Sequence, residues 1–234
     1  MVKHNYINLT KGYLQRKAAW EILLKVSSGI YSDQALEKVL VNYKFNPLDI
    51  AFITELSFGC IRYRKYLDLW LDNTSKFPHD RQPPKLRWLL HIGLYQLLKM
   101  DKIPISAAIS TTVEIAKHTD IKGLSGVVNA ILRKTSKKIE IKDFPNLSDN
   151  KAIRISNLES LPLWLIYEMI DWVGQDSAAK IAAAFNKRPT IDMRVNSLKT
   201  NVDKILEELK NQNIEAFKIR DLVNGIELKS KSRN

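Results

Sequence analysis

Residues 86–100 read LRWLLHIGLYQLLKM, and this stretch decides the fold class. Its apolar side chains surround a helix axis almost completely, interrupted only by Arg87, His91, Gln96 and Lys99. A helix that is apolar nearly all round packs against neighbours on several sides. The run is too short and too charged to cross a bilayer. We therefore expect a buried central helix in a protein that does not enter a membrane.

Amphipathic stripes on both sides of this stretch predict the helices that cover it. Residues 19–60 carry apolar side chains spaced by three or four positions in successive segments. Pro104 opens another helix, and residues 124–132 have apolar side chains at i, i+3, i+4, i+7 and i+8. Residues 1–139 are therefore expected to form an all-α bundle.

The rest of the chain changes character. Residues 140–156 lose the helical period and predict a linker, with an ordered crossing segment as the alternative. Residues 157–234 begin with two helical stripes, after which apolar and polar residues alternate over 191–195, which predicts a half-buried strand. Asn224-Gly225 is a hairpin dipeptide between two short strand-like runs. The sequence thus predicts a mostly α protein: an all-α bundle, a linker and a smaller α+β segment.

The excess positive charge is concentrated in the predicted bundle. The whole chain has a formal net charge of +12. Residues 1–139 hold 22 Lys and Arg against 11 Asp and Glu, a net +11, which leaves +1 for residues 140–234. Such one-sided charge is typical of a protein that meets nucleic acid. The alternative is a lysine-rich proteome that raises the isoelectric point of every protein.

Three basic clusters are the candidate RNA contacts. The first helix carries one, the run RYRKY at residues 62–66 is the second, and the end of the last bundle helix is the third. Arginine can donate two hydrogen bonds to a phosphate, and tyrosine can stack on an unpaired base. The alternative for each cluster is a solvated helix face. The predicted RNA-binding residues are Arg16, Lys17, Arg62, Arg64, Lys65 and Lys134.

Residues with catalytic or metal-binding patterns are not found in the sequence. Cys60, the single cysteine, lies on an apolar helix and is expected to be a core residue, with a reducing cytoplasmic compartment. The four histidines are scattered without ligand spacing, so no metal is expected, and His91 is expected to be a hydrogen-bonded core residue. No glycine-rich phosphate-binding pattern and no signal peptide occur.

Seven short segments resemble one protein family, and they occur in the family's order. The segments are LSFGCIR (56–62), GLYQLL (93–98), IP (103–104), VNAILR (128–133), LPLWL (161–165), NKRP (186–189) and MRVN (193–196). The first four are similar to the NusB-like helical domain that opens the RsmB (also called Sun or Fmu) small-subunit ribosomal RNA cytosine-5 methyltransferases. The last three are similar to the RRM-like segment that follows it there.

This resemblance implies a targeting role and no chemistry for the chain itself. In the family, S-adenosylmethionine binds a glycine-rich loop after a Rossmann-type strand, and a cysteine in a Pro-Cys motif is the nucleophile. Neither motif is present in this sequence, and Cys60 falls in the NusB-like part. We therefore expect a chain truncated before the cofactor domain, with no catalytic and no cofactor-binding residues, whose partner is ribosomal RNA.

Two other functions stay open at this point. A NusB-like transcription antitermination factor would also bind RNA, but residues 157–229 count against it because such factors end with the bundle. The second alternative is a helical protein-interaction scaffold with no RNA role. The concentration of positive charge in residues 1–139 disfavours it.

Overall fold

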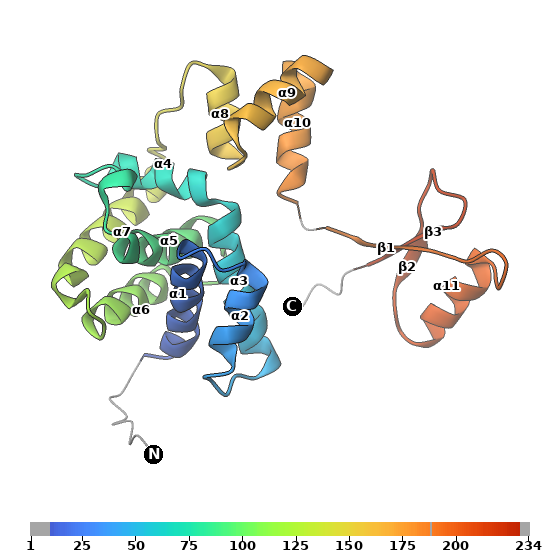
Figure 1. Cartoon of the computed structure of the whole chain (residues 1–234), viewed down its shortest axis with the longest axis horizontal. Helices are drawn as coiled ribbons and strands as arrows, with labels where there is room; N and C mark the ends of the chain where they lie inside the picture. Colours follow the sequence, from blue (N-terminus) through green and yellow to red (C-terminus); the bar gives the residue numbers. More distant parts are fainter. Residues whose placement is uncertain (1–9, 188, 230–234) are drawn as a thin grey trace. The chain divides into compact units, whose positions relative to one another are not determined.

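The computed structural model describes residues 10–187 and 189–229, which fall in two compact units that divide after Phe185. Figure 1 labels their elements. The first unit contains α1 (Tyr13–Ser27), α2 (Ser32–Leu40), α3 (Pro47–Arg62), α4 (Arg64–Thr74), η1 (His79–Arg81), α5 (Pro84–Lys99), α6 (Ile105–Lys117), η2 (Lys122–Leu124), α7 (Ser125–Glu140), α8 (Lys151–Leu158), α9 (Leu163–Val173) and α10 (Gln175–Phe185). The second contains β1 (Ile191–Arg194), α11 (Val202–Asn211), β2 (Ala216–Lys218) and β3 (Gly225–Leu228).

Helix α5 is the centre of the first unit, as residues 86–100 predicted. It contacts α1, α3, α4, α6 and α7, which surround it in Figure 1. Ten of its sixteen residues are buried, and they include the polar side chains of His91 and Gln96. Pro84 begins the helix, where its missing N–H would have no intrahelical partner. The predicted all-α bundle around a buried helix is confirmed.

Two glycines let neighbouring helices approach α5 closely. A Cβ atom on Gly93 would lie 2.6 Å from Cδ1 of Leu132 on α7. A Cβ atom on Gly59 of α3 would overlap the ring of Tyr95. Any larger residue at either position would therefore force the side chain of Leu132 or Tyr95 to shift. These contacts join three of the segments that carry the family resemblance.

The connection between α7 and α8 is tied to the bundle. Residues 141–150 contain no helix, but Phe144 packs edge-on against the Trp70 ring with centroids 6.2 Å apart. Pro145 is buried beside it in the chain. Helix α8 then packs on α4, and α9 and α10 pack on α8. The stretch 140–156, predicted to be a linker, therefore includes part of a helix and makes tertiary contacts.

We expect limited proteolysis to cut the chain first at residues 186–190. This segment follows the point where the chain passes from one compact unit to the other, and proteases cut connections before packed helices. Residues 141–150 should be cut later because Phe144 and Pro145 anchor them. Mass spectrometry should show a stable fragment ending near residue 185. A first cut within 141–150 would instead support the linker that the sequence predicts.

The second unit is a three-stranded antiparallel sheet with one helix. The strand order is β1-β3-β2, and α11 contacts β2. Val195, Val202 and Ile226 form its small core. Residues 219–224 join β2 to β3, so a hairpin is present where Asn224-Gly225 predicted one. The expected mostly α fold with a smaller α+β part is confirmed.

The predicted burial along residues 191–195 holds at Val195, which is 7% exposed, but not at the two apolar residues within β1. Ile191 and Met193 are 58% and 37% exposed, although their alternation with polar residues predicted one buried face. The cause is the topology: β1 is an edge strand, and α11 lies against β2 at the other edge. Alternation reports which side chains share a face, but it does not report whether another element covers that face.

No helix among residues 10–187 and 189–229 is long and apolar enough to span a membrane.

Candidate RNA-binding surface

The densest predicted cluster lies where α3 ends and α4 begins. Arg62 is the last residue of α3 and Arg64 the first of α4, and both are exposed. The guanidinium carbon of Arg64 lies 5.6 Å from the centroid of the Trp88 ring. Neither arginine forms an ion pair within the described residues. Their N–H groups are therefore available for phosphate oxygens.

The two tyrosines of this cluster do not present free faces to RNA. Tyr63 and Tyr66 are half-buried, and Nζ of Lys99 lies 4.4 Å and 4.7 Å from their ring centroids. Burial lowers the pKa of Lys99, and the charge of Glu159 partly opposes this shift. Both rings thus hold a cation of the protein itself. The base stacking that the sequence suggested for these tyrosines has no support in their surroundings.

Lys65 is half-buried and is held by contacts within the first unit. Its Nζ donates to Oγ of Ser156 at 2.6 Å and to the backbone oxygen of Leu161 at 3.0 Å. The backbone N–H of Tyr66 donates to Oγ of Ser160 at 3.0 Å. Burial lowers the pKa of Lys65. Lys65 therefore links α4 to the connection between α8 and α9. With its ammonium group held in this way, Lys65 is poorly placed for an RNA contact.

Arg16 is also a structural residue. It is 5% exposed, and its Nε donates to Oε1 of Gln96 at 2.6 Å. Its Nη1 donates to the backbone oxygen of Gly12, and its guanidinium carbon lies 5.1 Å from the centroid of the Phe52 ring. Burial lowers the pKa of Arg16 to about 10, so the side chain stays charged at neutral pH. The RNA contact predicted for it conflicts with this burial.

The remaining two predicted residues reach solvent. Lys17 lies 3.6 Å from Glu21 in an i, i+4 pair with both side chains 32% exposed. Such a surface pair is weak and leaves the lysine free to exchange partners. Lys134 is exposed on α7 and lines a cavity between α7 and the start of α5. Arg62, Arg64, Lys17 and Lys134 are therefore the predicted contacts that the structure leaves accessible.

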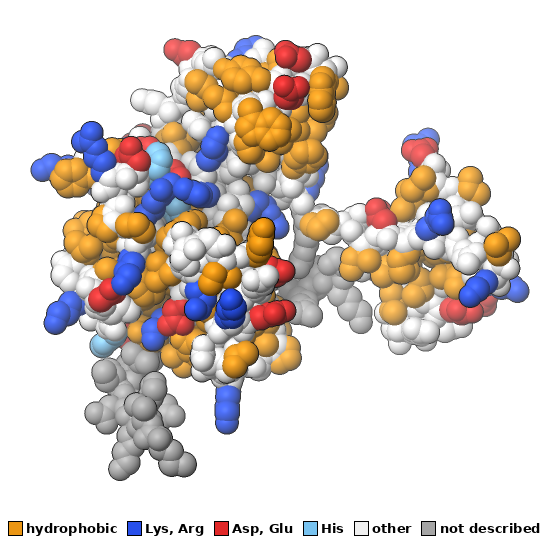
Figure 2. Space-filling model, viewed as in Figure 1, with side chains coloured by type: hydrophobic (Ala, Val, Ile, Leu, Met, Phe, Trp, Pro, Cys, Tyr) orange, Lys and Arg blue, Asp and Glu red, His pale blue; other side chains and the backbone are white. Residues whose placement is uncertain are grey.

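The accessible cations do not form a single patch. In the face shown in Figure 2, Lys and Arg side chains are spread over the first unit with acidic side chains between them. Arg62 and Arg64 mark the α3–α4 junction, whereas Lys134 is on α7. RNA that touches both sites would have to follow the bundle surface.

The buried thiol and imidazole have structural roles. Sγ of Cys60 donates to the backbone oxygen of His91 at 3.4 Å, and burial raises the pKa of the thiol. Nε2 of His91 lies 2.9 Å from Oδ1 of Asp68. Both side chains are fully buried, as the sequence predicted for core residues. Among the residues that the structure describes, no group of three or more His, Cys, Asp or Glu side chains could hold a metal ion.

A bundle packed around one buried helix, followed by a small α+β unit, is the architecture of a NusB-type protein with an added domain. The sequence model of the NusB family matches residues 14–137, more than half of the chain, and the chain belongs to this family. A second family model, the RsmF/B-like methyltransferase ferredoxin-like domain, matches residues 161–233. Both matches confirm the resemblance found in the short segments. One residue of the segment NKRP (186–189), Arg188, lies outside the described residues.

The curated relatives are ribosomal RNA methyltransferases. The probable ribosomal RNA small subunit methyltransferase B of Synechocystis is 34% identical over 86% of this chain and 45% of its own length. The corresponding Bacillus subtilis protein is 30% identical over 87% of this chain and 45% of its own length. This chain therefore spans less than half the length of these relatives, in their N-terminal part.

A solved structure shares the fold. The one described as "Crystal Structure of PH0851" superimposes with a TM-score of 0.63 at 17% identity, over 95% of this chain and 49% of that one. At this identity the likeness supports the fold alone.

Proposed function

We propose that this chain binds ribosomal RNA and directs a small-subunit cytosine-5 methyltransferase to its substrate. The observation that carries the proposal is the 34% identity with a probable ribosomal RNA small subunit methyltransferase B over 86% of the chain. The net charge of +11 on residues 1–139 supports a polyanionic ligand. Arg62 and Arg64 are the residues we assign to phosphate contacts first, since both are exposed and unpaired in the described structure.

The described residues do not fit S-adenosylmethionine, the expected cofactor of the whole family. The family site needs a glycine-rich loop after a Rossmann-type strand, whereas the sheet described here is three-stranded and antiparallel. The only cysteine is fully buried, and burial raises its pKa, so no thiolate can reach a base. We therefore assign neither cofactor binding nor methyl transfer to these residues.

The purified chain is expected to transfer no methyl group to unmodified small-subunit ribosomal RNA. Labelled S-adenosylmethionine measures this directly, with a full-length relative as positive control. Methyl incorporation above the no-protein background would overturn the assignment.

The binding of ribosomal RNA should depend steeply on salt. The logarithm of affinity should fall with the logarithm of salt concentration with a slope of about −0.7 to −0.9 per phosphate contact. Changing Arg62 and Arg64 together to glutamine should weaken binding and flatten the slope. The number of phosphate contacts that the slope reports should fall by up to two. Fluorescence anisotropy with labelled RNA at several salt concentrations measures both quantities. Lys65 is left unchanged because it holds α8 and α9.

The matched control removes two charges elsewhere on the same unit. Lys38 and Lys44 are exposed near α2, and changing both to glutamine lowers the net charge equally. This control should bind RNA nearly as the unchanged chain does. Equal losses in the two double variants would mean that only total charge matters and that the α3–α4 junction is a solvated face.

A NusB-like antitermination factor is the second candidate, because the NusB model covers the bundle. The ferredoxin-like match over residues 161–233 favours the methyltransferase assignment. Preference for small-subunit ribosomal RNA over another structured RNA of equal length distinguishes the two.

A further inference from the structure

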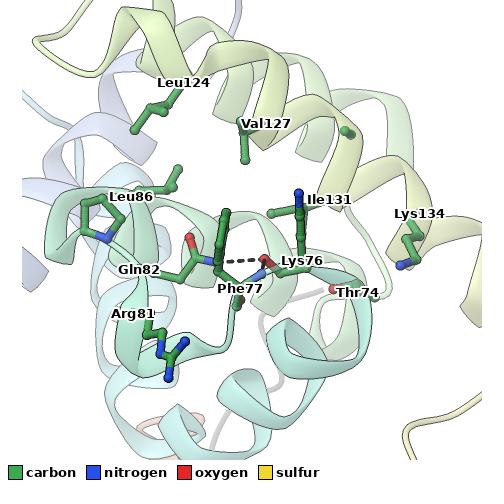
Figure 3. Close-up of a pocket in the computed structure, with 13 residues that line it drawn as sticks. Thr74, Lys76, Phe77, Arg81, Gln82, Leu86, Leu124, Val127, Ile131 and Lys134 are labelled. Atoms are coloured by element: carbon green, nitrogen blue, oxygen red, sulfur yellow. Dashed lines mark hydrogen bonds between the residues drawn. The ribbon is translucent and has the colours of Figure 1, made fainter.

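A cavity of about 750 Å³ opens on the first unit, away from the α3–α4 junction. It lies between the end of α4, η1, the start of α5 and helix α7 (Figure 3). One wall is aliphatic and is formed by Leu86, Leu124, Val127 and Ile131. The opposite side is formed by the segment from Thr74 to Pro83. Of the segments that link the chain to its family, only VNAILR (128–133) reaches this cavity, through Ala130 and Ile131.

Gln82 presents an unused hydrogen-bond acceptor to the cavity. The side chain is 8% exposed, and its Nε2 donates to Oγ of Ser75 at 2.7 Å and to the backbone oxygen of Phe77 at 2.9 Å. A carbonyl oxygen can only accept, so the amide nitrogen must face it and Oε1 must point the other way. Figure 3 shows that oxygen directed toward the aliphatic wall. No described residue donates to it.

The rim of the cavity combines an aromatic ring with three cations. Phe77 is 56% exposed, and its ring points into the space below Leu86 and Val127 in Figure 3. Lys76, Arg81 and Lys134 are exposed around the opening, and none of them is ion-paired within the described residues. Nζ of Lys76 lies 5.7 Å from the centroid of the Phe77 ring. Because Lys76 and Phe77 are both exposed, unlike the half-buried tyrosines beside Lys99, a base can take the place of Lys76 on the ring. An occupant that satisfies every group here has apolar faces, an N–H donor at one edge and negative charge outside.

We propose that this cavity binds one unpaired nucleotide. The base would lie between Phe77 and the aliphatic wall, with an N–H of its edge donating to Oε1 of Gln82. Its phosphates would face Lys76, Arg81 and Lys134. Where the nucleotide belongs to the bound ribosomal RNA, the site rests on the proposed function. It would then add contacts to a base, whereas the other proposed contacts are all to phosphates.

An aliphatic anchor of a protein helix fits the cavity less well. Leucine or isoleucine could fill the wall, but it would cover Oε1 of Gln82 without offering a donor. A buried acceptor that loses water and gains no partner opposes binding. The three unpaired cations also favour a ligand that carries negative charge next to its apolar part.

The test blocks the cavity without touching its cations. Val127 is 41% exposed, so Val127→Trp should fill the space and leave the fold intact. Val41→Trp, at an 85% exposed position on α2's end, is the matched control. We expect Val127→Trp to weaken binding of a short single-stranded RNA about tenfold, because stacking of one base on an aromatic ring has an effect of that order. Binding of duplex RNA should be unaffected, whereas the salt slope for the single-stranded RNA should flatten by the phosphate contacts that are lost.

Mononucleotides test whether the cavity also binds a free nucleotide that is not part of an RNA chain. Nuclear magnetic resonance shifts on adding adenosine or uridine monophosphate should appear at the cavity and disappear in Val127→Trp. Phe77→Leu, which keeps an apolar side chain and removes the aromatic ring, should weaken single-stranded RNA binding in the same direction.

The outcomes separate this site from the proposed function. If the unchanged chain binds single-stranded RNA and both tryptophan variants bind equally well, the nucleotide site is overturned and the proposed function stands. If no RNA binds but mononucleotides occupy the cavity, the proposed function fails and the nucleotide site stands. Binding of an acidic amphipathic peptide in the cavity, with no nucleotide binding, would overturn the site.

Discussion

Replacing Asp68 with alanine should lower the free energy of unfolding by about 3–5 kcal/mol, the usual effect of removing one partner from a buried ionic group. Oδ1 of Asp68 accepts from Nε of Arg87 at 2.8 Å and lies 2.9 Å from Nε2 of His91. The side chain of His91 is fully buried and that of Arg87 is 17% exposed. Without the carboxylate, a cation and an imidazole would stay inside the bundle unpaired. Urea denaturation followed by circular dichroism measures the change.

Asp72 on the same helix is the matched control. Its side chain is 39% exposed and lies 2.9 Å from Nδ1 of His79. Water can replace this partner, so Asp72→Ala should cost less than about 1 kcal/mol. Similar losses for Asp68→Ala and Asp72→Ala would show that the Asp68 contacts are not buried in solution.

The same cluster makes the fold sensitive to acid. Burial raises the pKa of Asp68, but the hydrogen bonds from His91 and Arg87 outweigh this and hold it below the usual 3.8. Burial lowers the pKa of His91 below 6.5. A lowered folded-state pKa means that the unfolded chain takes up its proton first on acidification, so stability falls with pH. The unfolding free energy should begin to decrease as pH drops through 6.5 for His91, and decrease further below 3.8 for Asp68.

One histidine variant assigns the first part of this decrease. His91→Gln removes the buried imidazole and should flatten the dependence just below pH 6.5. The same slope in His91→Gln and in the unchanged chain would mean that another group titrates.

The helical core could be predicted from the sequence because burial there depends on local periodicity. Residues 86–100 are apolar around the whole helix, and only the centre of a bundle can cover such a surface. The same reasoning placed Cys60 and His91 in the core, where the structure has them. Topology limited the prediction for Ile191 and Met193, since no local pattern tells which edge of a sheet α11 will contact.

The predicted RNA contacts were harder to separate because charge alone does not reveal a partner. Lys65 has a partner 91 residues away, Ser156, which no sequence spacing indicates. Arg16 did carry a signal: it stands three, four and seven positions before Ala19, Trp20 and Leu23, which are all buried. A basic residue on the apolar stripe of a helix is expected to enter the core with that stripe.

Arg16→Ala is therefore expected to destabilise the bundle, by about 2–4 kcal/mol. The change removes the donor to Oε1 of Gln96, which is 1% exposed, and the contact of the guanidinium with the Phe52 ring. Lys17→Ala, one position further on a half-exposed face, should cost less than about 1 kcal/mol. Thermal and urea unfolding of the two variants side by side measure the difference.

A double variant shows that the loss comes from the unpaired amide of Gln96 rather than from missing volume. Arg16→Met keeps most of the stem but leaves Oε1 of Gln96 without a donor, so it should still be destabilised. Adding Gln96→Leu removes that acceptor. In the unchanged chain Nε2 of Gln96 donates to the backbone oxygen of Ile92 at 2.8 Å, so the leucine takes a side-chain partner only from this helix carbonyl. The pair should recover most of the stability, because replacing both partners of a buried hydrogen bond by apolar groups is nearly neutral. If Arg16→Ala instead unfolds like the unchanged chain and loses RNA affinity, Arg16 reaches solvent and belongs to the RNA-binding surface after all.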